Sequence, residues 1–199
     1  INNISDARKV QSGLTQAYMV YEIVAEGGIT RYLALFRNVD DVKQIGSVRS
    51  SRHYYLDYVL ENDAIYVHWG WSPQAQEDIK SLKINNINGL YDSGFYRSNP
   101  FKLATEHTGF TTWENIQKVI DKKGYKRTTD KGLLLDYSAE SIDLSKHGET
   151  TEAKTITIDY SKHAKNKYVY DEATKGYLRF VSGNPQKDYN NDTQLNIKN

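Results

Sequence analysis

The feature that most constrains the fold is the stretch 64–83, where a short apolar run leads directly into a helix signal. AIYVHW at 64–69 has the β-branched and aromatic residues typical of a strand, and Gly70 ends it. Ser72 and Pro73 then predict a helix to about Lys83, because serine caps a first turn and proline fits its first position. A strand followed at once by a helix is typical of α/β folds.

Two apolar stretches precede this unit. QAYMVYEIVAE at 16–26 and ITRYLALFR at 29–37 are rich in strand-forming residues and are separated by glycines. Glycine adopts the positive φ of tight turns, so the pair predicts a hairpin.

Helix signals flank the unit on both sides. Helical spacing predicts a helix over 51–61, with Ser50 or Ser51 as its N-cap. TTWE at 111–114 offers Thr111 as a second cap, and Gly124 fits the position after the end of that helix. We therefore expect an α/β main domain over residues 1–150, built as a layered mixed sheet with flanking helices.

The pattern changes after residue 150. TITIDY at 155–160 alternates between apolar and polar residues, and KYVYDEATKGYLRF at 167–180 predicts a hairpin. So few strands cannot close a core by themselves. We expect 151–199 to be the first part of a β-rich C-terminal domain, an incomplete small module.

Composition excludes several classes of protein. The net charge is +1, which gives no general basis for nucleic-acid binding, and no apolar run approaches the length of a membrane helix. The absence of cysteine excludes disulfides, thiol catalysis and zinc–thiolate sites. No signal peptide is present and the chain starts at Ile1, so we expect a targeting segment to lie upstream.

The stretch IGSVRSSR at 45–52 has the residues of an anion site. Arg49 and Arg52 supply bidentate donors, while Ser50 and backbone amides at a helix start favour negative charge. The alternative is a solvated turn whose arginines pair with Glu61 or Asp57.

Acid–base candidates lie nearby in sequence. Glu26 and Arg31 flank the glycine turn, either as a base and a phosphate clamp or as a weak cross-strand salt bridge. His68 ends a strand, where ligands gather in α/β sheets, although a hydrogen-bonded core histidine fits equally. His107 lies on a loop, but no close spacing joins it to His68 as a metal site, so we expect no metal and no cofactor.

Long motifs carry a resemblance to a known family. EGGITR at 26–31, IGSVRSSR, YVHWGWSPQA at 66–75 and EHTGFTT at 106–112 resemble segments of the YerB-type lipoproteins of Gram-positive bacteria, a family of unknown function. Ser47, Trp69 and Trp71 depart from the family's pattern. The resemblance implies an extracellular protein, anchored by an N-terminal lipid at the outer face of the cytoplasmic membrane. Its matching residues add Ser72, His107 and Thr111 as ligand-binding candidates.

The order of elements is also similar, more weakly, to the layout of LytR-CpsA-Psr phosphotransferases, which hold polyprenyl pyrophosphate. The leading hypothesis is an envelope lipoprotein that binds an anionic small molecule or cell-wall polymer through Arg31, Arg49, Ser50 and Arg52. Glu26 and His68 would be the catalytic pair if a reaction occurs. The alternatives are a scaffold for another envelope protein and a wall-polymer phosphotransferase or hydrolase.

Overall fold

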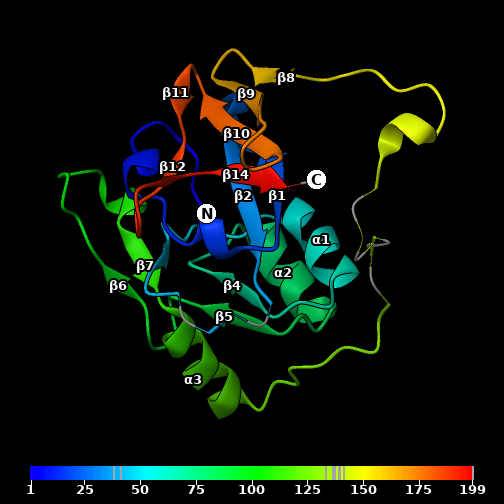
Figure 1. Cartoon of the computed structure of the whole chain (residues 1–199). Coiled ribbons are helices and arrows are strands. Elements are labelled where there is room, and N and C mark those ends of the chain that lie inside the picture. Colours follow the sequence, from blue (N-terminus) through cyan, green and yellow to red (C-terminus); the bar gives the residue numbers. More distant parts are fainter. Residues whose placement is uncertain are drawn as a thin grey trace.

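The computed structural model describes residues 1–37, 39–40, 42–132, 134–135, 138, 140 and 142–198. Helices and short sheets form the main part of the chain, and the C-terminal part is β-rich (Figure 1). This is the α/β architecture with a β-rich module that the sequence predicts. None of the described helices is both long and apolar enough to cross a membrane.

The main part contains α-helices and short strands with these bounds: β1 (Met19–Val24), β2 (Thr30–Leu35), β3 (Ile45–Gly46), α1 (Leu56–Glu61), β4 (Tyr66–His68), α2 (Pro73–Ser81), β5 (Asn86–Asn88), β6 (Tyr96–Arg97), β7 (Gly109–Thr111) and α3 (Trp113–Lys123). The C-terminal part contains strands: β8 (Thr155–Ser161), β9 (Ala164–Asp171), β10 (Gly176–Val181), β11 (Asn184–Pro185), β12 (Lys187–Asp188), β13 (Thr193–Gln194) and β14 (Asn196–Lys198). Short 3-10 helices cover Ala7–Val10, Leu14–Gln16, Glu26–Gly28, His53–Tyr55, Thr105–His107 and Leu144–Lys146.

The predicted hairpin is confirmed. Strands β1 and β2 pair antiparallel, with Glu22 opposite Tyr32 and Ile23 opposite Arg31. The turn between them needs positive φ at Gly27 and Gly28, which glycine adopts without strain. Because side chains alternate along a strand, Tyr32 and Arg31 point to opposite faces of the hairpin.

Two small sheets lie beside the hairpin. Strands β4 and β5 pair in parallel, and β3, β7 and β6 form an antiparallel sheet in that order. Residues 48–51 join the two sheets: the Val48 amide donates to the Gly109 carbonyl (2.7 Å), and the Trp69 amide donates to the Arg49 carbonyl (3.0 Å). The stretch IGSVRSSR is therefore extended backbone built into the fold rather than a solvated turn.

The start of α1 differs from the prediction of a serine cap. The 3-10 turn His53–Tyr55 precedes α1, and the Ser50 hydroxyl donates to the Trp69 carbonyl (3.1 Å) instead of capping a helix. The Ser51 amide donates to the Gly70 carbonyl (2.9 Å). Pairing with residues 69–71 therefore uses the Ser50 hydroxyl and the Ser51 amide, which the sequence pattern had assigned to a helix N-terminus.

The other helix ends follow the sequence more closely. The Ser72 hydroxyl accepts from the Ala75 amide and caps α2, which ends at Ser81 rather than near Lys83. The cap of α3 is Thr112, one residue after the predicted Thr111, which instead belongs to β7. Gly124 ends α3 in the left-handed conformation, as predicted.

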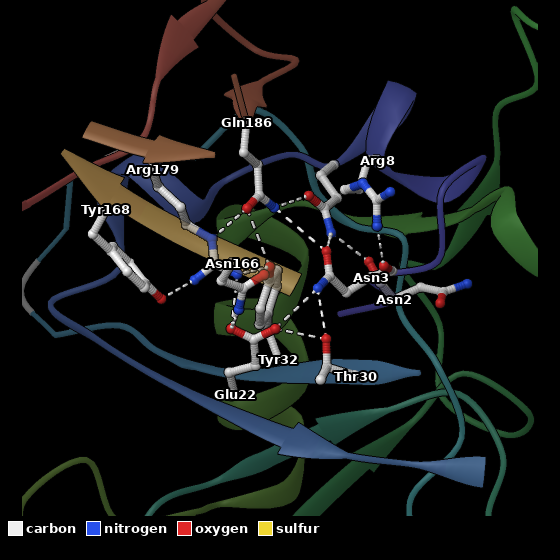
Figure 2. A network of polar contacts seen from close by, with 11 residues as sticks. Asn2, Asn3, Arg8, Glu22, Thr30, Tyr32, Asn166, Tyr168, Arg179 and Gln186 are labelled. Atoms are coloured by element: carbon white, nitrogen blue, oxygen red, sulfur yellow. Dashed lines mark hydrogen bonds and ion pairs between the residues drawn. The ribbon is translucent and has the colours of Figure 1, made fainter. Parts of the chain in front are cut away.

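Strands β8 to β11, with β14, form one antiparallel sheet that lies next to the hairpin (Figure 1). A buried ion pair connects the two: Arg179 Nη2 lies 2.7 Å from Glu22 Oε2, and both side chains are about 95% buried. Asn166 and Thr30 also donate to the Glu22 carboxylate, at 2.7 and 2.6 Å. Figure 2 shows these side chains converging from β1, β2, β9 and β10.

The network extends to the N-terminal segment. Arg179 Nη2 also donates to the Tyr32 hydroxyl (2.8 Å), and Arg179 Nε donates to Gln186 Oε1 (2.5 Å). Asn3 donates to Glu22 (3.2 Å) and Thr30 (2.7 Å). A second anchor is Asp188, whose buried carboxylate accepts from backbone amides of residues 13 and 15. The C-terminal strands are thereby fixed to the face of β2 that carries Tyr32.

Replacing Arg179 with methionine tests this anchor. Arg179→Met leaves the Glu22 carboxylate buried without its cation, so we expect it to lower the free energy of unfolding by about 3–5 kcal/mol in urea. Lys165→Met is the matched control, because the Lys165–Asp159 pair is more than half exposed on both sides and contributes at most ~1 kcal/mol. Equal small losses in both variants would contradict the anchoring role of Arg179.

Candidate functional site

A cavity of about 740 Å³ lies between the hairpin and the layer formed by β4, α1 and α3. Its walls include Leu33 from β2, Val59 from α1, Val67 from β4 and Ile116 from α3. Polar lining is contributed by Arg31, Arg49, Ser50 and Tyr55. The fold thus brings three of the predicted anion-binding residues to one hollow.

Arg31 is a buried arginine with incomplete hydrogen bonding. Its side chain is 5% exposed, and its Nη atoms donate to Glu26 Oε2 (3.1 Å) and the Ser50 carbonyl (3.3 Å). Its buried Nε has no hydrogen-bond partner among the described residues. A buried donor left without an acceptor is rare, because it costs about 1–3 kcal/mol.

Arg49 shows the same deficiency. Its Nη1 donates to the Glu106 carbonyl (2.9 Å), and its Nη2 lies 3.8 Å from the Glu106 carboxylate. Its Nε is buried and, within the described part of the chain, also lacks a partner. Burial, and next the charge of Arg31, lower the pKa of Arg49.

Glu26 joins two arginines, Arg31 and Arg52. Its carboxylate is paired with Arg31 and, through the other oxygen, with Arg52. Partial burial acts to raise the pKa of Glu26, but the hydrogen bond from Arg52 and the charge of Arg31 outweigh it and lower the pKa. Glu26 is therefore ionised at neutral pH and neutralises part of the arginine charge.

The cluster remains electropositive. Three guanidinium groups face two carboxylates, and the side chains of Glu26 and Glu106 are 55% and 58% exposed. Exposed carboxylates are well solvated and screened, so Glu26 and Glu106 compensate the charge of their arginine partners only weakly. The expected pairing of the arginines with Glu61 or Asp57 is replaced by these partners.

Tyr55 is a lining residue that the sequence did not identify as functional. Its ring is 5% exposed, and its hydroxyl has no hydrogen-bond partner in the described residues. Burial raises the pKa of the hydroxyl, which keeps it protonated and able to donate. In the sequence, Tyr55 is one apolar position of a predicted helix, and no local signal separates it from ordinary core residues.

His68 lies in a different environment from Glu26. Its ring is 1% exposed and is held by the Gly70 carbonyl at Nδ1 (2.8 Å) and Asn86 Oδ1 at Nε2 (3.2 Å). It stacks on Tyr66 and contacts Trp71. Burial lowers the pKa of His68, which favours the neutral ring. His68 and Glu26 share no direct hydrogen-bond partner among the described residues.

The remaining candidates make structural contacts. Ser72 caps α2, and the buried Thr111 hydroxyl donates to the Gly94 carbonyl (2.9 Å). His107 is buried, with Nδ1 2.8 Å from Asn2 Nδ2. None of these three lines the cavity. Among the residues that the structure describes, no group of three or more histidine, aspartate or glutamate side chains is placed to hold a metal ion.

The Trp69 ring packs against the backbone at Gly89 and Gly109 and does not line the cavity. A Cβ added at Gly89 or Gly109 would lie 2.8 or 2.7 Å from its ring, so both glycines are needed for this close approach. The guanidinium carbon of Arg97 lies over the Trp69 ring, 4.7 Å from the ring centroid. Trp69, one of the two tryptophans that depart from the YerB-type pattern, is thus a packed side chain.

Comparisons with known proteins agree on one family. A family model described as the N-terminal domain of a protein of unknown function (DUF3048) matches residues 1–126, and the model of its C-terminal domain matches residues 156–199. The chain is 34% identical, over 188 residues, to a Bacillus subtilis (strain 168) protein described as "Putative lipoprotein YerB". That match covers 92% of this chain and 54% of the relative.

A solved structure gives the same result. The crystal structure of the YerB protein from Bacillus subtilis superposes with a TM-score of 0.81 at 30% identity, covering 98% of this chain and 63% of the other. The chain therefore spans about half the length of the curated relative and under two thirds of the crystallised one. The N-terminal family model alone covers more than half of the 199 residues. The chain belongs to the DUF3048 family of proteins of unknown function, and it is similar to YerB, a protein of the type that its motifs resemble.

Proposed function

We propose that this chain is the ligand-binding part of an envelope lipoprotein, and that Arg31 and Arg49 bind a phosphate or carboxylate group at the cavity. One observation carries the proposal: both arginines line the same cavity, and each keeps a buried Nε without an acceptor. Native proteins seldom leave such donors unpaired unless the site has a role. An anion that accepted from both would remove the penalty of each.

The charge of the cluster supports an anionic ligand. The pKa of Arg49 is lowered, first by burial and then by the charge of Arg31, so the site stores unfavourable positive charge. A bound anion would relieve that repulsion, whereas a neutral or cationic ligand would not. Tyr55 would add a hydroxyl donor from the same wall.

The envelope location rests on a relative. The Bacillus subtilis protein is described as a lipoprotein, and 92% of this chain matches it. A lipoprotein of this kind would be anchored at the outer face of the cytoplasmic membrane, where phosphate- and carboxylate-bearing wall components are available.

The proposal concerns binding and names no reaction. Glu26 and His68, the predicted acid–base pair, have separate hydrogen-bond partners. Catalysis by this pair would need both side chains within reach of one substrate. A wall-polymer phosphotransferase or hydrolase therefore stays a second hypothesis, as does a scaffold that binds another envelope protein.

Arg49→Gln tests the binding site with inorganic phosphate as the probe. The variant removes a charged donor, and a hydrogen bond to a charged group contributes about 1.5–3 kcal/mol, so we expect phosphate to bind about 10–100-fold more weakly. Chemical-shift titration by NMR measures such weak affinities. The control is Arg97→Gln, because Arg97 is exposed on β6 and does not line the cavity. Equal weakening in both variants would show only general charge attraction and would contradict the site.

Glu26→Gln tests the same site through a substitution that we expect to strengthen phosphate binding. The Glu26 carboxylate competes with a bound anion for Arg31 and Arg52, and the substitution removes its charge while keeping its size. We expect phosphate to bind up to about fivefold more tightly, the equivalent of ~1 kcal/mol from a partly exposed pair. Weaker binding in the same titration would mean that Glu26 is itself part of the ligand contact, against this account.

A further inference from the structure

We infer that the ligand of the arginine pair is an amphiphile, with its phosphate or carboxylate at Arg31 and Arg49 and an apolar tail in the cavity. This inference rests on the proposed anion site and specifies the class of molecule that it takes. Its basis is that the arginines lie in the wall of a hollow whose other walls are mainly aliphatic and aromatic.

Several apolar side chains of the cavity lining are only partly buried. Leu33, Ile65, Val67 and Trp113 all line the cavity, and each is only partly buried although it lies within or beside a core strand or helix. Apolar surface facing a hollow loses the contacts that close packing would provide. An apolar tail would restore those contacts and remove the surface from water.

The hairpin register joins the two parts of the site. Strand β2 carries Arg31 and Leu33, two residues apart and therefore on the same face, while Tyr32 points to the Glu22–Arg179 network. A molecule that placed its anionic group at Arg31 would have its next atoms beside Leu33. Residues of one strand, β2, would thus both bind the anionic group and bury the apolar tail.

Two other basic residues of the cavity lining, Lys126 and Arg127, are poorer partners for the anionic group. Lys126 pairs with Asp130 at 3.1 Å, and Arg127 pairs with Asp121 at 2.7 Å. The four side chains are 46–96% exposed, so water and these carboxylates already satisfy the cations. The unpaired, buried donors lie at Arg31 and Arg49 instead.

The size of the cavity limits the tail. About 740 Å³ falls within the ~300–1,000 Å³ usual for small-molecule pockets, which suits a single medium-length chain with its head group. Single-tailed alkyl phosphates and alkyl carboxylates share this chemistry and differ only in the head.

The test compares inorganic phosphate with hexyl, octyl and decyl phosphate below their critical micelle concentrations, with the carboxylates of equal length as a parallel series. Calorimetric titration measures each affinity. We expect about fourfold tighter binding per methylene until the cavity is filled, because each buried methylene contributes a constant increment. The series with the tighter absolute affinity identifies the head group. Affinity that does not rise with chain length, while Arg49-dependent phosphate binding persists, would overturn the amphiphile and leave the anion site intact. Loss of phosphate binding as well would overturn both.

Filling the cavity provides the complementary test. Val67→Phe places a larger ring in the hollow, so we expect it to reduce the gain from the longer chains while leaving the affinity for inorganic phosphate unchanged. Leu33→Trp does the same from the opposite wall, in case Val67→Phe impairs folding. Val20→Phe is the matched control, because Val20 lies exposed on β1 outside the cavity. If affinity still rises with alkyl chain length in both cavity variants, the placement of the tail is contradicted.

Discussion

The buried ion pair between Glu22 and Arg179 is the interaction on which the arrangement of this protein depends. It joins a strand of the hairpin to a strand 157 residues away, and both side chains are removed from water. Buried pairs stabilise only when their remaining donors and acceptors are satisfied. Here Asn3, Thr30 and Asn166 complete the shell of Glu22 (Figure 2). The network fixes the outer face of β2 and therefore positions its inner face, which carries Arg31 over the cavity.

The arginines on the two sides of β2 are in opposite states. Arg179 has a partner for each of its nitrogens, whereas Arg31 and Arg49 each keep one buried donor without an acceptor. The first state is expected of a structural contact, and the second of a site that is complete only with a ligand. This contrast within one molecule is the physical reason to separate the anchor from the proposed binding site.

Local sequence patterns predicted the elements that depend on local chemistry. The glycine turn after Glu26, the Ser72–Pro73 start of α2 and the Gly124 end of α3 follow from backbone freedom and capping. The same patterns misplaced the start of α1, because pairing of residues 49–51 with 69–71 holds Ser50 and Ser51 extended. Neighbouring threonines made the cap of α3 ambiguous, and tertiary pairing in β7 took Thr111.

The site was only partly predictable for the same reason. Family-type motifs identified Arg31, Arg49 and Ser50, which the fold brings to one cavity. Motifs alone gave no means of separating them from Ser72 or Thr111, whose hydroxyls serve the backbone. The partners Glu106 of Arg49 and Glu22 of Arg179 lie far away in sequence, so only the folded chain reveals which arginines are satisfied.

A crystal structure of the protein with decyl phosphate tests the central claim most directly. The account predicts phosphate oxygens within hydrogen-bonding distance of Nε of both Arg31 and Arg49, with the decyl chain lying along Leu33 and Val67. It is contradicted if the phosphate lies elsewhere, or if both Nε atoms are paired with protein acceptors and side chains fill the cavity.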